Sequence, residues 1–186
     1  MRIGLISDTH LPSSIREPWV EVAQAFSRVD LILHAGDIVT PRILDWLENF
    51  APVIAALGNN DFGMDDPRVK PVQTLDVEGW RLGLIHDTTS GAQFKHSVDI
   101  LVSGHTHYER LAHVDGVVHV NSGSATLPHH YSTRLGTVGI LDVERERLVA
   151  TIVRLGDGPL ANGTLLPNPG QELRLEVARD GLHPGA

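Results

Sequence analysis

Two histidines, His105 and His107, stand two residues apart in Gly104-His105-Thr106-His107, directly after an apolar run over residues 100–102. In an extended segment this spacing lets both imidazoles point to one side. The pair alone has two interpretations, because imidazoles bind divalent metals and also serve as hydrogen-bonding groups on surfaces and in cores. Its meaning depends on whether other apolar runs end in similar side chains.

Several other apolar runs also end in side chains whose nitrogen or oxygen atoms can bind a metal ion as hard or borderline ligands. Together the donors are Asp8, His10, Asp37, Asn59, His86, His105 and His107. Ligands bind outside the carboxyl ends of strands in open α/β sheets, so these side chains can converge on one crevice. Taken singly, Asp and Asn also suit turns and helix caps, and a lone histidine suits a hydrogen-bonded core site. Finding all of them at the ends of apolar runs favours a metal site.

The apolar runs also predict the elements that would position these residues. In the first half, strands are expected at 3–6, 31–33 and 53–57, and helices at 17–28 and 41–50. Thr40 is expected to cap the second helix, with Pro41 as its first residue. In the second half, hairpins are expected at 72–85, 111–120 and 137–155, with a short helix at 91–98, a strand at 100–102 and an edge strand at 172–177. This order predicts a layered α/β fold, with either one mixed sheet or two packed sheets flanked by helices.

Composition limits the chemistry. The 186 residues are 41% hydrophobic and 20% charged, which is ordinary for one globular domain. The net charge of -8 argues against a nucleic-acid footprint and a polybasic membrane face. With no cysteine, any metal must be held by nitrogen and oxygen ligands, and bound metal would supply the positive centre that an anionic substrate needs. No apolar stretch reaches membrane length and the N-terminal run is too short for a signal peptide, so a cytoplasmic location is expected.

Five short motifs, in this order, resemble those of the calcineurin-like metallophosphoesterases: Asp8-x-His10, Gly36-Asp37, Gly58-Asn59, a lone His86 and Gly104-His105-Thr106-His107. The chain resembles the small prokaryotic phosphodiesterase branch of that superfamily, and also the retromer scaffold subunit of the same fold. The resemblance implies an α/β fold in which two packed mixed β-sheets are flanked by helices in a four-layer sandwich. It covers a metallophosphoesterase domain at residues 1–154, with 155–186 as a C-terminal tail or extra edge strand.

The resemblance also implies a dinuclear metal centre. A first ligand group, Asp8, His10 and His107, would hold one ion. A second ligand group, Asn59, His86 and His105, would hold the other, and Asp37 would bridge the two. Two divalent ions can activate a water and stabilise both oxygens of a displacement at phosphorus. Manganese is the expected metal, with Fe, Zn, Ni and Mg as alternatives.

The implied activity is that of a phosphodiesterase, which would hydrolyse small or nucleotide-like phosphate esters by attack of a metal-bound hydroxide. A phosphomonoesterase, or a non-catalytic metal-binding scaffold of the same fold, is the alternative. The expected partner is a small-molecule phosphate ester; homo-oligomerisation stays open.

Three positions depart from the family pattern. Asn60 stands where the superfamily often has histidine, so as a catalytic and substrate-binding residue it could donate a hydrogen bond but not a proton, which favours good leaving groups. Asp87 stands in place of the usual glycine, and could orient His86, repel a substrate phosphate or point to solvent. Asn121-Ser122-Gly123-Ser124 resembles the family's Asn-Pro-Gly-Ser and is expected to line the site.

The remaining histidines are weaker candidates. His34 is expected to pack behind the site. His129 and His130 are expected in an exposed loop, with a role as a replacement acid as the alternative.

Overall fold

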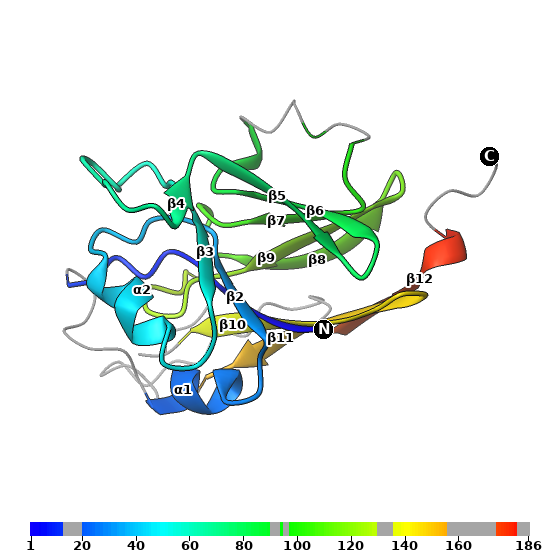
Figure 1. Cartoon of the computed structure of the whole chain (residues 1–186), viewed down its shortest axis with the longest axis horizontal. Coiled ribbons are helices and arrows are strands. Elements are labelled where there is room, and N and C mark those ends of the chain that lie inside the picture. Colours follow the sequence, from blue (N-terminus) through cyan, green and yellow to red (C-terminus); the bar gives the residue numbers. More distant parts are fainter. Residues whose placement is uncertain (13–19, 90–93, 95–96, 130–135, 156–173, 182–186) are drawn as a thin grey trace.

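The computed structural model of the protein describes residues 1–12, 20–89, 94, 97–129, 136–155 and 174–181. Two β-sheets pack face to face (Figure 1). The seven-stranded sheet has the order β12 (Arg174–Ala178), β11 (Arg147–Arg154), β10 (Thr137–Glu144), β1 (Arg2–Ile6), β2 (Leu31–His34), β3 (Val53–Ala56) and β4 (Val69–Lys70). The five-stranded sheet has the order β5 (Val72–Val77), β6 (Trp80–Ile85), β7 (Ile100–Ser103), β9 (Val117–Ser122) and β8 (Glu109–Val114).

Both sheets are mixed, and the parallel strands are those that lead into the candidate ligands. Strands β1 to β4 run parallel to one another, while β10, β11 and β12 are antiparallel. In the other sheet β6, β7 and β9 are parallel. Parallel neighbours end at the same edge of a sheet, so each sheet presents its candidate ligands at one edge.

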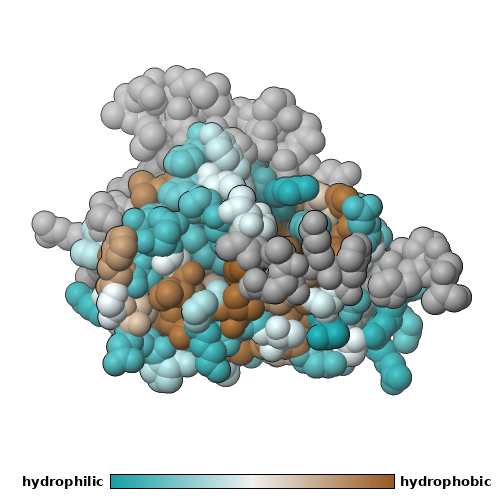
Figure 2. All heavy atoms as spheres, turned by 90° about the horizontal axis from the view of Figure 1, so that it is seen from above, coloured by the Kyte–Doolittle hydropathy of each residue, from teal (hydrophilic) through white to brown (hydrophobic). Residues whose placement is uncertain are grey.

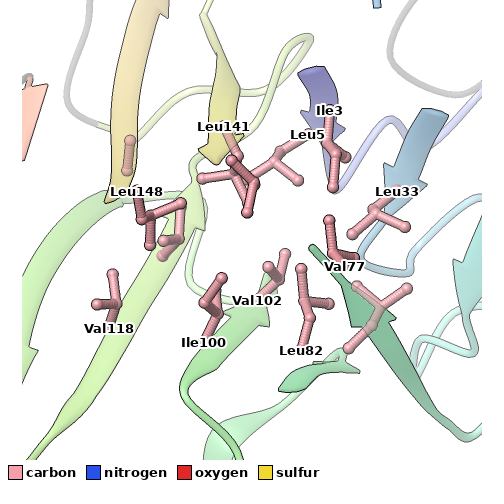
Figure 3. Close-up of a cluster of buried hydrophobic side chains, with 14 of the residues drawn as sticks. Ile3, Leu5, Leu33, Val77, Leu82, Ile100, Val102, Val118, Leu141 and Leu148 are labelled. Carbon is pink, nitrogen blue, oxygen red and sulfur yellow. The ribbon is translucent and has the colours of Figure 1, made fainter. Parts of the chain in front are cut away.

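The main core lies between the two sheets. Ile3 and Leu5 of β1 and Leu33 of β2 point toward Leu82 of β6 and Val102 of β7 (Figure 3). Successive side chains of a strand alternate between its faces, so the residues between these point the other way. The continuous apolar runs of the parallel strands therefore serve two cores at once.

The second core lies on the outer face of the seven-stranded sheet, under the helices α1 (Val20–Phe26) and α2 (Arg42–Leu47). Ile32 and Val53 of the sheet pack there with Phe26 of α1 and Leu44 of α2. A third apolar cluster, which includes Ile85 and Leu101, lies on the outer face of the five-stranded sheet. Seen from above, that side of the molecule carries a band of hydrophobic residues bordered by hydrophilic ones (Figure 2).

The expectation of two packed mixed sheets with helices on the outside is confirmed, and all the expected strands and hairpins are present. Much of the predicted helix at 91–98, and the start of the one at 17–28, lie outside the described residues. The two-residue strand β4 was not predicted, since so short a segment has no readable period. No helix in the described ranges is long and apolar enough to cross a membrane.

The predicted start of the second helix was wrong by one residue. Pro41, not Thr40, is the cap of α2, and no side chain caps it. Ile43 donates its N–H to the carbonyl of Thr40 in a tighter turn, and the first α-helical bond runs from Asp45 N–H to the Pro41 carbonyl. A 3₁₀-type turn at Thr40 therefore takes the place of the expected side-chain cap.

Candidate metal centre

The strand ends of the two sheets meet at one place. Gly104 N–H donates to the His86 carbonyl, 2.9 Å away, and His105 N–H donates to both carboxylate oxygens of Asp8 at 3.0 and 3.1 Å. A Cβ atom on Gly104 would lie 1.9 Å from Ser7 Oγ. Only glycine allows the turn after β7 to approach the end of β1 so closely.

The first ligand group of Asp8, His10 and His107 forms one compact cluster with Asp37. One ligand atom from each of these four side chains lies within 4.8 Å of every other. His10 Nε2 is 3.3 Å from both His107 Nε2 and Asp37 Oδ2. His107 Nε2 is 3.5 Å from Asp8 Oδ1. Two carboxylates and two imidazoles converge as a nitrogen–oxygen donor set for a divalent cation.

The second ligand group gathers around the amide oxygen of Asn59. That oxygen lies 2.9 Å from His105 Nδ1 and 3.0 Å from His86 Nε2. His86 Nε2 in turn is 3.4 Å from Asp37 Oδ1. Asp37 therefore has Oδ2 beside the first group and Oδ1 beside the second.

The imidazole orientations test whether this donor set fits metal ions. His86 Nδ1 lies 2.7 Å from the Ala35 carbonyl, and His107 Nδ1 lies 2.8 Å from the Leu127 carbonyl. A carbonyl only accepts, so each Nδ1 carries a hydrogen and each neutral ring directs its Nε2 lone pair into the cluster. His86 Nε2 and Asn59 Oδ1 are then two acceptors facing each other, an arrangement that needs a proton or a metal ion between them. The residues fit divalent metal.

Burial and hydrogen bonds set the charges of the two carboxyl groups in different ways. Burial raises the pKa of Asp8 to about 7, although the hydrogen bond from the Ser7 hydroxyl and the nearby His86 act against it. Burial alone would also raise the pKa of Asp37, but two hydrogen bonds from Asn60 and the nearby imidazoles bring it below its ordinary value. A bound cation would stabilise the ionised form of Asp8, so metal binding would release protons.

The backbone at the centre is strained. Five candidate ligands adopt positive φ angles: Asp8 at 53°, His10 at 46°, Asp37 at 56°, His105 at 71° and His107 at 60°. Non-glycine residues seldom adopt this left-handed conformation, and each such residue costs on the order of 1 kcal/mol. Strain of this kind persists where the surrounding structure over-determines the backbone, and it marks functional sites.

Asp61 supports the centre and was not predicted to do so. Its carboxylate accepts four backbone N–H groups, from Asp37 at 3.1 Å and from Ile38, Val39 and Gly58 at 2.7 Å each. It therefore ties the loop after β2 to the loop after β3. The sequence carries no local signal for this role, because three of the four donors lie more than 20 residues earlier in the chain.

Asn60 contacts Asp37 through both of its donors. Its side-chain amide donates to Asp37 Oδ2 at 2.7 Å, and its backbone N–H donates to Oδ1 at 2.8 Å. Asn121 holds the turn that carries His105 and His107, because its amide donates to the Gly104 carbonyl at 2.7 Å. Nearby, the Ser124 hydroxyl donates to the Asp8 carbonyl at 2.7 Å.

Two further histidines border the centre. His34 is buried between the Thr9 hydroxyl and Gly36 N–H, and burial lowers its pKa to about 3, as suits a neutral packing residue. His129 was expected in an exposed loop; it is exposed, yet its ring stacks on that of His107 with centroids 4.4 Å apart. His130 lies outside the described residues.

Comparison with known proteins agrees with this geometry. The model of the calcineurin-like phosphoesterase superfamily domain matches residues 1–146. A probable metallophosphoesterase of Methanothermobacter thermautotrophicus is 38% identical over 167 residues, 84% of this chain and 94% of that protein.

Two solved structures share the architecture. A structure reported as a novel archaeal phosphodiesterase is 26% identical, covers 82% of this chain and 100% of its own, and has a TM-score of 0.62. Vacuolar protein sorting 29 from Cryptosporidium parvum, at 19% identity, covers 95% of this chain and 97% of its own, with a TM-score of 0.76, which is a likeness of fold. From the family model and the archaeal relative together, the chain belongs to the calcineurin-like phosphoesterase superfamily.

Proposed function

We propose that this protein is a dinuclear metal-dependent phosphodiesterase that hydrolyses small or nucleotide-like phosphate esters. The observation that carries the proposal is the position of Asp37 between the two ligand groups. Its Oδ2 is 3.3 Å from His10 of the first group and its Oδ1 is 3.4 Å from His86 of the second. One carboxylate with an oxygen toward each group is suited to bridge two ions.

In this proposal the first ligand group and the second ligand group each hold one divalent ion, with manganese as the expected metal. When bound, the ions supply Lewis-acid activation of water and neutralise the charge that develops on the phosphate. The chain's own part is to orient the donors. The carbonyls of Ala35 and Leu127 fix the rings of His86 and His107, and Asp61 fixes the loop of Asp37.

Asn60 is the proposed substrate-binding residue. Its amide is next to Asp37 and carries N–H donors, so it can hydrogen-bond a phosphate oxygen or the oxygen of the leaving group. It has no proton to transfer at neutral pH. Esters with good leaving groups, such as aryl and nucleotide esters, should therefore react faster than simple alkyl esters.

The proposal is tested by removing metals with a chelator, restoring Mn²⁺, and assaying an aryl phosphodiester beside the matching aryl phosphomonoester. We expect hydrolysis of the diester that depends on Mn²⁺, and about two ions per chain by elemental analysis. An intact fold with well under one ion per chain and no turnover would instead favour the scaffold alternative. Turnover of the monoester alone would identify a phosphomonoesterase.

The two histidines of the Gly104 turn should serve different ions. His107→Ala should weaken the ion of the first ligand group first, because His107 Nε2 faces Asp8. His105→Ala should weaken the other ion, because His105 Nδ1 faces Asn59. Metal titration should resolve a loss of affinity of roughly 100-fold or more at one ion in each variant. The affected ion should be that of the first ligand group in His107→Ala and that of the second ligand group in His105→Ala. Loss of the same ion in both variants would contradict the assignment.

A further inference from the structure

Asp87 lies next to the second ligand group, on the side of the His105 ring that faces away from Asn59. His105 directs Nδ1 toward Asn59 at 2.9 Å, and its other nitrogen, Nε2, is 4.0 Å from Asp87 Oδ2. The carboxylate therefore faces His105, while His86, the residue beside it in sequence, points inward to Asp37. This places a fixed anion at the rim of the candidate metal centre.

The Asp87 carboxylate is held in place in its charged form. Thr89 donates its backbone N–H to Oδ1 at 2.8 Å and its hydroxyl to Oδ2 at 2.7 Å. These two hydrogen bonds fix the orientation of the Asp87 carboxylate beside His105. Its side chain is 32% exposed, so a ligand can approach it from solvent.

A pocket of about 400 Å³ begins at Asp87 and extends over the end of the five-stranded sheet. Thr106, Tyr108 and Arg110 line it, and Thr106 belongs to the turn that carries His105 and His107. Arg110 brings a positive charge to the lining of this pocket. Burial of His119 and the charge of Arg110 both lower the pKa of His119. Asp87 makes the rim next to His105 anionic, and the pocket beyond it has room for a further group of a substrate.

We propose that Asp87 makes the centre select phosphodiesters over phosphomonoesters. A monoester carries a second negative charge above its second pKa of about 6, whereas a diester carries one charge and a second ester group. The Asp87 carboxylate repels the extra charge of the monoester, and the neighbouring pocket receives the second ester group of the diester. This inference rests on the proposed phosphodiesterase activity and assigns its specificity to a residue outside both ligand groups.

The first test compares kcat/KM for an aryl phosphodiester and the matching aryl phosphomonoester in the Mn²⁺ form, well above that second pKa. Asp87→Asn should raise the monoester value roughly tenfold while the diester value changes less than about threefold, as expected when the removed charge acts twice as strongly on a dianion as on a monoanion. Asp87→Glu, which keeps the charge, should keep the wild-type ratio. Asp142→Asn removes the same charge from β10, where Asp142 pairs with Arg2, and should leave the ratio unchanged.

The second test measures binding without turnover, by calorimetry with phenylphosphonate as a dianion and its monomethyl ester as a monoanion. Asp87→Asn should tighten binding of the dianion roughly tenfold and of the monoanion by no more than about threefold, because repulsion by one charge is half as strong for the monoanion. An equal change for both ligands, or equal losses of kcat/KM for both substrates, would make Asp87 an orienting residue for His105 and overturn the proposal. Absence of turnover in the wild type would count against the proposed function. The ratio of dianion to monoanion affinity, compared between Asp87→Asn and the wild type, would still decide the role of Asp87.

Discussion

Asp37→Ala should lower the metal-dependent hydrolysis of an aryl phosphodiester by roughly 1,000-fold or more while the protein stays folded. In the described part of the chain, Asp37 is the one side chain whose two oxygens face different ligand groups, at 3.3 and 3.4 Å. Its removal takes a ligand from both proposed ions at once. Removal of any other ligand would disturb one ion first. The measurements are kcat/KM with Mn²⁺, the number of ions bound per chain and the unfolding transition of the metal-free protein.

Two variants make the Asp37 result specific. Asp142→Asn, on β10 opposite Arg2 at the start of β1, is far from the carboxyl end of β1 and should retain wild-type activity and metal content. Asp37→Asn keeps one carbonyl oxygen and should show an intermediate loss of metal. If Asp37→Ala hydrolysed the diester at the wild-type rate, the observed turnover would not come from this centre.

The sequence predicted the strands and the ligands together because both depend on local patterns. Short apolar runs such as the one before Asp37 define buried parallel strands, and the chain direction fixes which end carries the polar residues. The positions of Asn59 and His86 at strand ends were therefore readable without knowing which strands pair. Their contact through Asn59 Oδ1 agrees with that expectation.

Features that depend on long-range contacts were not readable in the same way. Asp61 looks like an ordinary turn residue in the sequence, and only the packing of two loops gives it four N–H donors. His129 stacks on His107 across a separation of 22 residues. The left-handed backbone at Asp8 and His105 was not readable either, because Asp and His adopt positive φ more often than most residues but do so at few positions.

The strained backbone of the candidate metal centre lowers the stability of the folded protein, and other contacts must offset this loss. Positive φ angles at five candidate ligands sum to several kcal/mol at on the order of 1 kcal/mol each. In the absence of metal, the hydrogen bonds that hold these loops are what keep the conformation. The carboxylate of Asp61 supplies four of them, more than any other side chain among the described residues around Asp37.

Asp61→Ala should therefore lower the free energy of unfolding by about 3–5 kcal/mol, because it leaves four backbone N–H groups without their charged acceptor. Asp61 is only 5% exposed, so water replaces that acceptor poorly. The variant should also bind Mn²⁺ roughly 10- to 100-fold more weakly, since the loops of Asp37 and Asn59 are no longer tied together. Denaturant unfolding of the metal-free protein and metal titration measure the two effects.

Asp65→Ala is the control for this prediction. Asp65 is an exposed aspartate of the same loop, so the free energy of unfolding of this variant should stay within about 0.5 kcal/mol of the wild type. Equal stability of the two variants would mean that the Asp61 hydrogen bonds do not hold the centre in the metal-free protein.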